Sequence, residues 1–436
     1  MKVLLVSHTA LSRTNNMGKT LLSYLRGFKP GEVAQLYIHS EVPTDDTICT
    51  YYYRFTDIDA IKSIVNPRQH GKIFTQEDIE LERDIARIDE GIVNSAYVLG
   101  SKRRAWSMNA RELAWKLSHW KKTELKLWID KFGPDVILFA SGDYTFMYNI
   151  ALWVADYCKK PLVTICVDDY YIHERNGDSL LGHLHYSKFM KAVRRTMSRS
   201  SCIFTLSDLM KVAYEKMFNK PCFTVHNSVP HKELELNPER NKISYMGNLG
   251  FGRVEQLVAL GKAMASLHRT EEPIAIDVYT GSYNQGFLDT LNKAKGIRLH
   301  GRISAEEVLN VMQNSLATIH TESFDKENQE LVRYSVSTKI AESLMYGPCL
   351  LAYGPDGIAS IDYLKENNVA YVITREEQLI DGLNRLIVDQ KMRRAIEARA
   401  RILAMQNHDA EVAPKLVRTW LEKVSEQSES LKAARV

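Results

Sequence analysis

The densest group of residues that could do chemistry lies in residues 335–355, SVSTKIAESLMYGPCLLAYGP. Ser337 and Thr338 can cap a helix, and this places Lys339 in the first turn of that helix. A cation in the first turn opposes the helix dipole, so its position needs a reason. A bound phosphate supplies one, because the free N–H groups of the helix start and the lysine ammonium would hold the same anion.

Two further features of the same string suit a nucleotide. Glu342 lies three residues after Lys339 on the same helix face, where its carboxylate can accept hydrogen bonds from a ribose diol. The apolar run 349–352 predicts a strand that delivers the backbone of Tyr353 and Gly354 beside this site. An ordinary surface Lys–Glu pair is the simpler interpretation, but it leaves the rest of the string unexplained.

A second candidate anion site lies near the N-terminus, in the string MGKT at residues 17–20. A phosphate-binding P-loop needs a glycine five residues before its Gly-Lys pair, and Arg13 occupies that position. This excludes a P-loop nucleotide hydrolase. Gly18 can still present the backbone N–H groups of a helix start to one phosphate or sugar hydroxyl, or it can simply belong to a helix cap.

A third candidate site follows the apolar run 162–167. Asp168 and Asp169 come directly after this expected strand, and ligands of open α/β sheets bind at such strand ends. A metal needs more oxygen ligands than two adjacent side chains offer, so we expect no metal site and favour contacts with sugar hydroxyls or capping of the next turn. His173 in the same loop is either a substrate contact or an ordinary structural histidine.

Short apolar runs alternate with helical patterns along the chain, and this alternation predicts the elements that position these residues. In the first half the expected strands are 3–7, 136–140, 162–167 and 202–206. In the second half they are 243–246, 274–279, 297–299, 317–320, 349–352 and 370–373. Continuous apolar strands separated by helices are typical of parallel sheets covered on both faces. We therefore expect an α/β protein with two Rossmann-like domains that face a cleft.

The segment 229–242 is rich in Pro, Asn and charged residues, and it predicts a linker between the two domains. The expected division is an N-terminal domain at 1–228, this linker, a C-terminal domain at 243–408 and a final helix at 409–436. Each of the two domains is long enough to bury a core of its own.

The composition is that of an ordinary globular protein, with 436 residues, 45% hydrophobic and 25% charged. The formal net charge of +4 is too small for a dedicated nucleic-acid binder. The six cysteines form no CxxC pair and no zinc-ligand spacing, which favours a reducing, cytoplasmic compartment. The first apolar run is too short for a signal peptide, and no stretch of about 18 apolar residues predicts a membrane span.

Residues 102–131 depart from the rest of the chain, with nine Lys/Arg against three Asp/Glu and four of the six tryptophans. The spacing of the apolar residues predicts an amphipathic helix. One interpretation places the tryptophans in the core and the basic face in water. The other is an interfacial surface that attracts anionic lipid or an anionic acceptor, with the protein peripheral at the inner face of a membrane.

Residues 335–355 resemble the donor-binding segment of retaining, family-4-type glycosyltransferases with the GT-B fold. The matching form is S-T-K-I-x-E-x-L-x-x-G-x-x-x-L-A-Y-G-P. Glu342 matches the second glutamate of the family, and the resemblance implies that it holds the nucleotide ribose. The first glutamate of the family falls on Tyr334, so that carboxylate is missing here unless Glu322 or Asp325 in the upstream loop takes its place.

The resemblance extends loosely to both halves of the chain. The string YMGNL at 245–249, followed by Arg253, is similar to the strand and glycine turn that open the second domain of the family. This implies donor contacts for Gly247 and Asn248. It also implies that Arg253 and Lys339 neutralise the diphosphate of the donor.

In the first half, Gly18 matches the first glycine-containing loop of the family. The family often has a His-Asp pair at the end of the strand 162–167, and here Val167-Asp168 stands in its place. Because the N-terminal domain is the acceptor side in this fold, the resemblance makes Asp168, Asp169 and His173 candidate acceptor contacts.

As a whole, the resemblance implies a hexosyltransferase-like glycosyltransferase of polysaccharide biosynthesis. Its donor would be a UDP- or GDP-linked sugar and its acceptor a glycan or a lipid-linked glycan. Transfer would retain the anomeric configuration and need no metal or other cofactor, since Arg253 and Lys339 stabilise the leaving diphosphate. Two alternatives stay open: a nucleotide-sugar epimerase of GT-B fold, which needs acid/base carboxylates, and a non-catalytic nucleotide-sugar-binding protein of glycan assembly, which the missing first glutamate favours.

Overall fold

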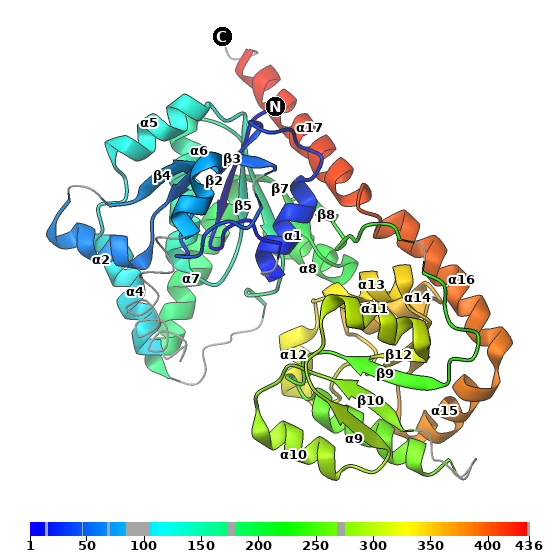
Figure 1. Cartoon of the computed structure of the whole chain (residues 1–436). Helices are drawn as coiled ribbons and strands as arrows, with labels where there is room; N and C mark the ends of the chain where they lie inside the picture. The colour runs from blue at the N-terminus through cyan, green and yellow to red at the C-terminus, as the bar shows by residue number, and fades with distance from the viewer. Residues whose placement is uncertain are drawn as a thin grey trace. The chain divides into compact units, whose positions relative to one another are not determined.

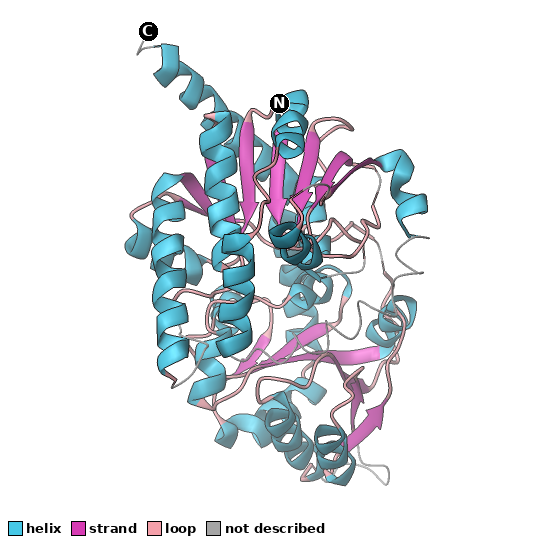
Figure 2. Ribbon diagram, turned by 90° about the vertical axis from the view of Figure 1, so that its left-hand side faces the viewer, coloured by secondary structure: helices cyan, strands magenta, loops and turns pink. Residues whose placement is uncertain are grey.

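The computed structural model describes residues 1–13, 16–45, 47–67, 70–83, 105–172, 179–232, 234–267 and 275–433. The chain folds into two compact units. Unit 1 contains Met1–Val225 together with Ala413–Val436, and unit 2 contains His226–Val412. Each unit is built around a largely parallel sheet that is packed between helices, which confirms the α/β class and the two sheet domains expected from the sequence (Figure 1, Figure 2).

The sheet of unit 1 has eight strands in the order β4-β3-β2-β1-β5-β6-β7-β8. They are β1 (Val3–Ser7), β2 (Val33–Tyr37), β3 (Cys49–Arg54), β4 (Lys72–Thr75), β5 (Val136–Ala140), β6 (Leu162–Cys166), β7 (Ser200–Thr205) and β8 (Cys222–Thr224). The edge strand β4 runs antiparallel to β3, and the other paired strands are parallel. Every residue of β1, β2, β5 and β6 is buried, as expected where helices cover both faces of a sheet.

The helices of unit 1 are α1 (Asn16–Leu25), α2 (Asp57–Val65), α4 (Ala105–Leu117), α5 (Thr123–Phe132), α6 (Thr145–Cys158), α7 (Leu180–Arg199), α8 (Asp208–Phe218) and α17 (Val412–Ala433), with a 3₁₀ turn at Gln76–Asp78. The expectation of one amphipathic helix over 102–131 is wrong, because α4 and α5 are separate helices. The chain between them is held on α2, since the backbone N–H of His119 donates to the Ser63 hydroxyl oxygen at 3.0 Å.

Some tryptophans of the segment 102–131 lie in the core, as one interpretation expects, and at least one is exposed, as an interfacial surface requires. Trp115 and Trp128 are 2% and 1% exposed and belong to the core, whereas Trp106 is 55% exposed. Residues 102–104, which contribute three of the basic side chains, lie outside the described residues. No helix in the described part of the chain is long and apolar enough to cross a membrane.

The sheet of unit 2 has six parallel strands in the order β11-β10-β9-β12-β13-β14. They are β9 (Lys242–Met246), β10 (Ile276–Tyr279), β11 (Ile297–His300), β12 (Ser315–Thr321), β13 (Cys349–Tyr353) and β14 (Tyr371–Ile373). The helices are α9 (Arg253–Ala265), α10 (Gln285–Lys293), α11 (Ala305–Asn314), α12 (Lys326–Val332), α13 (Thr338–Tyr346), α14 (Ala359–Glu366), α15 (Leu379–Val388) and α16 (Gln390–Asn407), with a 3₁₀ turn at Glu376–Gln378.

The segment expected as a linker, 229–242, belongs to unit 2 instead. The hydroxyl of Tyr346 donates to the Pro230 carbonyl oxygen, and Arg240 forms an ion pair with Glu397 at 2.7 Å. These contacts fasten the segment to α13 and α16. The change from unit 1 to unit 2 therefore falls at 225–226, a few residues before the expected boundary.

The final helix α17 returns to unit 1, where it runs beside α1 and β8 (Figure 1). Its buried side chains Val417 and Leu421 join the core cluster of that unit. Arg418 pairs with Glu32 at 3.0 Å. Apart from its first residue, the last helix is thus part of the first unit, although residues 226–411 of unit 2 precede it in the sequence.

In both sheets the strand order reverses at one point, and ligands of open α/β sheets bind at the carboxyl ends of the strands around such a point. The reversal lies between β1 and β5 in unit 1 and between β9 and β12 in unit 2. A ligand site is therefore expected at these two switch points.

Candidate functional site

In unit 2, two loops meet at the switch point. β9 leads into the glycine-containing loop 247–252 and then into α9, whose first residue is Arg253. The neighbouring strand β12 leads into the loop 322–325. A Cβ on Gly252 would lie 2.4 Å from the Oγ of Ser323, and Gly252 has a φ of +70°. A glycine is therefore needed for the two loops to pack this closely.

Gly247 and Asn248, expected as donor contacts, shape the first of these loops. The side-chain oxygen of Asn248 accepts a hydrogen bond from the Gly250 N–H at 2.7 Å, and its backbone carbonyl accepts one from the Tyr245 hydroxyl. A Cβ on Gly247 would lie 2.7 Å from that same hydroxyl oxygen. Both residues therefore hold the turn in shape, and their contact with a donor stays a prediction.

Arg253 and Glu322 form a buried ion pair at the centre of the switch point. The Nη2 of Arg253 lies 3.0 Å from each carboxylate oxygen of Glu322, and its Nε donates to the Thr321 carbonyl oxygen at 3.2 Å. The two side chains are 16% and 4% exposed. Burial raises the pKa of the Glu322 carboxyl, and the guanidinium opposes this shift. The carboxylate can be buried here because its cation is in place.

His320 is a candidate that the sequence analysis missed. Its Nε2 lies 3.4 Å from an Oε1 of Glu322 and 3.0 Å from the Ser360 hydroxyl oxygen. Burial, together with the positive charges of Arg253 and Lys339, lowers the pKa of His320 to about 3, so the ring is neutral at physiological pH. Strand spacing could have revealed it, because the period of two places His320 and Glu322 on the same side of β12 at its end.

Lys339 lies in the first turn of α13, as the sequence predicts. Ser337 is the N-cap residue, with its hydroxyl oxygen 3.4 Å from the Lys339 N–H nitrogen, and Thr338 is the first residue of the helix. Desolvation and the nearby charge of Arg253 lower the pKa of Lys339, whereas Glu342 raises it. The two predicted cations and the predicted carboxylate therefore lie close enough to influence one another, and an anion bound there would relieve the repulsion between the cations.

Tyr353 and Gly354 support this arrangement from the next strand. The carbonyl oxygen of Tyr353 accepts hydrogen bonds from the Glu322 N–H at 3.0 Å and from the Thr321 hydroxyl at 2.8 Å, and its ring packs in the core. A Cβ on Gly354 would lie 3.2 Å from the Cβ of Glu322. Both residues position Glu322, and a direct contact with a donor stays a prediction.

The structure distinguishes the two carboxylates that could replace the one missing at Tyr334. Asp325 is the N-cap of α12, since its Oδ2 accepts from the Asn328 N–H at 3.0 Å. Glu322 instead pairs with Arg253. Of the two carboxylates, Glu322 is therefore the one that contacts a cation of the candidate site, Arg253.

In unit 1, Gly18 lies in the first turn of α1, and close packing accounts for it. A Cβ at this position would lie 2.5 Å from the Ala10 carbonyl oxygen and 2.8 Å from the Cβ of Ser12. The glycine thus lets the helix start approach the loop that follows β1. A contact between this helix start and a phosphate or sugar hydroxyl stays a prediction.

Asp169 caps the loop after β6, the alternative that the sequence analysis set beside an acceptor contact. Its Oδ1 accepts hydrogen bonds from the Tyr214 hydroxyl at 2.6 Å and from the N–H groups of Tyr171 and Ile172 at 3.2 and 3.3 Å. The residue is 4% exposed. Its carboxylate holds the loop together, so Asp168 is the better acceptor candidate of the pair.

Asp168 is half-buried, and its Oδ1 lies 3.0 Å from the backbone nitrogen of Asp169. His173, the third candidate of this loop, lies outside the described residues. A contact of either residue with an acceptor stays a prediction. Within the described ranges, no group of three or more His, Cys, Asp or Glu side chains is arranged to hold a metal ion.

The switch point of unit 1 carries a cluster that the sequence analysis did not identify. His8 directly follows β1, and its ring stacks on that of Tyr144 at 4.9 Å between centroids. The Nη2 of Arg111 lies 3.1 Å from the Nε2 of His8, and its Nε lies 2.9 Å from Asp57 Oδ1. The guanidinium also lies 4.1 Å from the centre of the Tyr144 ring. Its members come from four separate segments, so no local spacing could have revealed the cluster.

Comparison with known proteins supports the assignment of unit 2 to an α/β domain of glycosyltransferase type. Residues 262–413, most of unit 2, match the family described as glycosyl transferase-like. No protein of curated function has a sequence that matches this chain. Unit 2 therefore carries a glycosyltransferase-like domain.

Solved structures resemble the whole chain at low sequence identity. HepE from Anabaena in complex with UDP has a TM-score of 0.62 at 10% identity, with 97% of this chain and 100% of that chain covered. The trehalose-6-phosphate synthase OtsA has 0.60 at 8% identity, covering 97% and 99%. Sucrose-phosphate synthase from Thermosynechococcus elongatus has 0.56 at 10% identity, covering 100% of both chains. These similarities show the fold, which is GT-B.

The lowered pKa of His320 predicts how unit 2 responds to acid. The buried ring is neutral, and once exposed by unfolding it takes up a proton below its ordinary pKa of 6.5. The unfolded state then binds more protons, so the free energy of unfolding should fall as the pH drops from 6.5 toward 4. In urea titrations of the full chain, His320→Gln should flatten this dependence.

The exposed His231, also in unit 2, provides the matched control, and His231→Gln should leave the profile unchanged. His408, whose pKa burial lowers to about 4, contributes to the dependence in the same direction. A His320→Gln profile that coincides with that of the wild type would show that His320 is not held neutral in the folded protein.

Proposed function

We propose that the protein is a glycosyltransferase that moves a sugar, by its resemblance a hexose, from a UDP- or GDP-linked donor to a glycan or lipid-linked acceptor. The observation that carries this proposal is the convergence of Arg253 and Lys339 beside the N-terminus of α13. Two cations and a helix start suit a diphosphate. The family match of unit 2 and the complexes of HepE with UDP and UDP-glucose support this donor chemistry.

The bond between the anomeric carbon and the diphosphate oxygen breaks through an oxocarbenium-like state. Negative charge then builds on the leaving oxygen, where Arg253, Lys339 and the N–H groups of α13 stabilise it. The acceptor oxygen forms the new bond to the anomeric carbon, and its proton passes to an oxygen of the leaving diphosphate. By the family resemblance, transfer retains the anomeric configuration and needs no metal or other cofactor.

The other residues of the site act by positioning. Glu322 holds the guanidinium of Arg253 through Nη2. Within the described residues Nη1 donates no hydrogen bond, so it can donate one to a phosphate oxygen. Glu342 accepts hydrogen bonds from the ribose diol, and the neutral His320 adds no third cation to the diphosphate site.

Unit 1 binds the acceptor in this proposal, at the carboxyl ends of its parallel strands. The side chains of Asp168 and His173 are the acceptor candidates from the sequence, whereas Gly18 is a predicted donor contact. The cluster of His8 and Arg111 adds hydrogen-bonding groups at the switch point between β1 and β5.

Incubating the full chain with UDP- and GDP-linked hexoses, alone and with an acceptor extract, tests the proposed activity. We expect release of UDP or GDP that depends on the acceptor. Formation of an epimer without acceptor would instead support an epimerase, and binding without turnover would support a non-catalytic protein of glycan assembly.

Adding EDTA to this assay should leave the rate of transfer nearly intact, because Arg253 and Lys339 neutralise the diphosphate. An activity that is lost with EDTA and restored by Mg²⁺ would contradict metal independence.

Replacing Glu342 by Ala should weaken nucleotide binding. A hydrogen bond to a charged group contributes about 1.5–3 kcal/mol, so calorimetry with UDP or GDP should show a loss of roughly tenfold or more. Glu366→Ala, which removes an exposed carboxylate from α14, is the matched control and should bind as the wild type does. If Glu342→Ala binds both nucleotides unchanged, Glu342 does not contact the ribose.

The proposal also places the protein in the cytoplasm, in contact with the inner face of a membrane through α4. Trp106, Leu113 and Leu117 lie along one stripe of this helix and are 55%, 55% and 52% exposed. Such a stripe can enter the lipid interface, and the basic side chains of the segment would add attraction to anionic headgroups.

Sedimentation with anionic vesicles tests the membrane contact. The variant with Trp106, Leu113 and Leu117 all changed to Gln should remain in solution under conditions in which the wild type sediments. A control with the exposed Ile380, Val388 and Ile402 of unit 2 changed to Gln should still sediment. A wild type that ignores the vesicles at low salt would exclude this contact and favour a soluble acceptor.

A further inference from the structure

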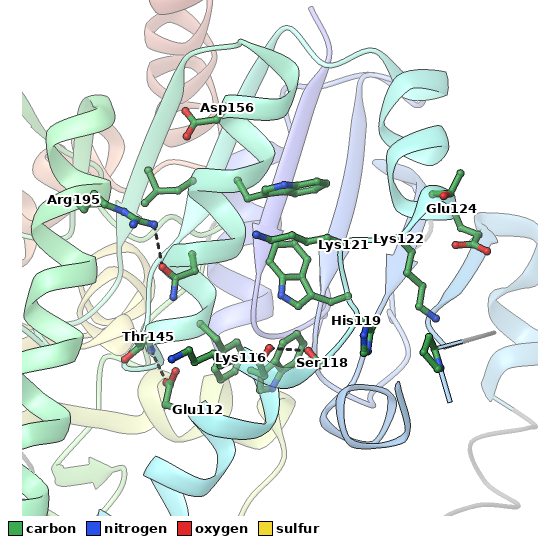
Figure 3. Close-up of a pocket in the computed structure, with 18 of the residues that line it drawn as sticks. Glu112, Lys116, Ser118, His119, Lys121, Lys122, Glu124, Thr145, Asp156 and Arg195 are labelled. Atoms are coloured by element: carbon green, nitrogen blue, oxygen red, sulfur yellow. Dashed lines mark hydrogen bonds between the residues drawn. The ribbon is translucent and has the colours of Figure 1, made fainter. Parts of the chain in front are cut away.

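Unit 1 contains a cavity of about 1100 Å³ that the proposed chemistry does not use (Figure 3). Its walls come from α4, the loop 118–122, the start of α5, α6 and α7. On α6 its lining runs from Thr145 to Asp156, which corresponds to about 16 Å at the rise of an α-helix. We call this elongated cavity the α6 groove.

Positive charge dominates the α6 groove. Lys116, Lys121, Lys122, Lys188 and Arg195 line it, against three acidic residues. In the part of the chain that the structure describes, no carboxylate lies within ion-pairing distance of any of these four lysines. Figure 3 shows that the basic side chains come from both sides of α6, with Arg195 on α7 and Lys121 on the loop before α5.

The acidic residues offset this charge only in part. Asp156 pairs with Arg199 at 3.2 Å. Glu112 accepts a hydrogen bond from the Thr145 N–H at 2.7 Å, and burial raises the pKa of its carboxyl to about 7. At neutral pH this carboxyl is therefore protonated in a large fraction of molecules. An anion in the α6 groove would meet five cations, opposed mainly by Glu124, the third acidic residue of the lining.

Aromatic rings form the other part of the lining. Trp120 and Trp153 meet edge to face, with ring centroids 5.2 Å apart and an angle of 83°, and Trp153 stacks on Tyr157. Trp115 stacks on Phe146 at 4.4 Å. Both indoles of the first pair are half-buried, so they are held in place and still reach the cavity. Fixed aromatic faces suit the C–H faces of sugar rings, which carry apolar area between their hydroxyls.

The α6 groove begins at the switch point of unit 1. Thr145, at one end of its lining, follows Tyr144 of the His8–Arg111 cluster, and Glu112 follows Arg111. A chain of sugars whose end lies at the switch point can therefore continue along α6.

We propose that the α6 groove binds an acidic oligosaccharide, a carbohydrate chain whose sugars carry carboxylate, sulfate or phosphate groups. The lysines and Arg195 hold the acidic groups, and the indoles of Trp120 and Trp153 hold the sugar rings. In a glycosyltransferase this occupant is the distal part of the acceptor. That last assignment rests on the proposed function, whereas the binding itself depends on unit 1 alone.

Fluorescence anisotropy with end-labelled oligosaccharides tests the groove in the absence of any nucleotide. The probes are a galacturonate hexamer, a hyaluronan hexasaccharide and neutral maltohexaose. We expect the wild type to bind at least one acidic probe, to bind it more weakly as salt screens the charges, and to bind maltohexaose weakly or not at all. Absence of binding to both acidic probes would overturn the proposal.

Variants locate the binding. Changing Lys121, Lys122 and Lys188 to Gln should weaken the acidic probe by about tenfold or more, because three charged contacts are lost. Changing the exposed Lys29, Lys216 and Lys415 of unit 1 to Gln makes the same change in net charge away from the groove and should have little effect. Trp120→Ala should also weaken binding. If both triple variants lose the same affinity for the acidic probe, the binding depends only on net charge, and this would contradict a specific site in the groove.

Two further measurements separate this proposal from the others. The first is binding to vesicles of anionic lipid. If the vesicles bind through Lys121, Lys122 and Lys188 and neither acidic oligosaccharide binds, the groove is a membrane-binding surface and the proposal is overturned. Calorimetry with UDP and GDP should give the same affinity for the groove variant as for the wild type. If the protein binds the acidic probe but no nucleotide, the groove proposal stands and the proposed function is refuted. If it binds the nucleotide but no acidic probe, the groove proposal is refuted and the proposed function stands.

Discussion

The buried pair of Arg253 and Glu322 is the interaction on which the candidate site of unit 2 depends. It joins the first residue of α9 to the residue that follows β12, and it thereby ties together the two loops of the switch point. Loss of either partner would leave an uncompensated buried charge, at a cost of about 3–5 kcal/mol. Because the Tyr353 carbonyl also holds the Glu322 backbone, the guanidinium is placed before any ligand binds. Charge preorganised in this way can stabilise a leaving group without further rearrangement.

The surroundings of this pair favour an anion over any other ligand. Glu322 offsets Arg253, so the charge of Lys339 is opposed mainly by Glu342 on the same helix. His320 is kept neutral by its burial and by the two cations beside it, and so it does not add to their repulsion. The N–H groups at the start of α13 add positive potential. A diphosphate would pair with the guanidinium of Arg253, the ammonium of Lys339 and these N–H groups at once, which a neutral sugar cannot do.

Local signals were sufficient to predict part of this arrangement, and long-range contacts explain the rest. The apolar runs of β9 and β12 and the helix start at Ser337 are local, and they placed Lys339 correctly. The sequence could not decide whether Glu322 or Asp325 replaces the carboxylate missing at Tyr334, because Arg253, which holds Glu322, is 69 residues away, and Asp325 instead caps α12. The single helix expected over 102–131 is interrupted for a similar reason, since Ser63 holds the chain from 56 residues away.

The two switch points differ in charge, and this difference separates the kinds of ligand that each can hold. At the switch point of unit 1, Arg111 is neutralised by Asp57 and covered by the rings of Tyr144 and Phe146, so the place suits uncharged hydroxyl groups rather than a phosphate. Unit 1 also carries positive charge at the α6 groove, whose four lysines have no carboxylate within ion-pairing distance among the described residues. A ligand with a neutral end and acidic groups farther along matches that sequence of environments, and a chain of sugars is such a ligand.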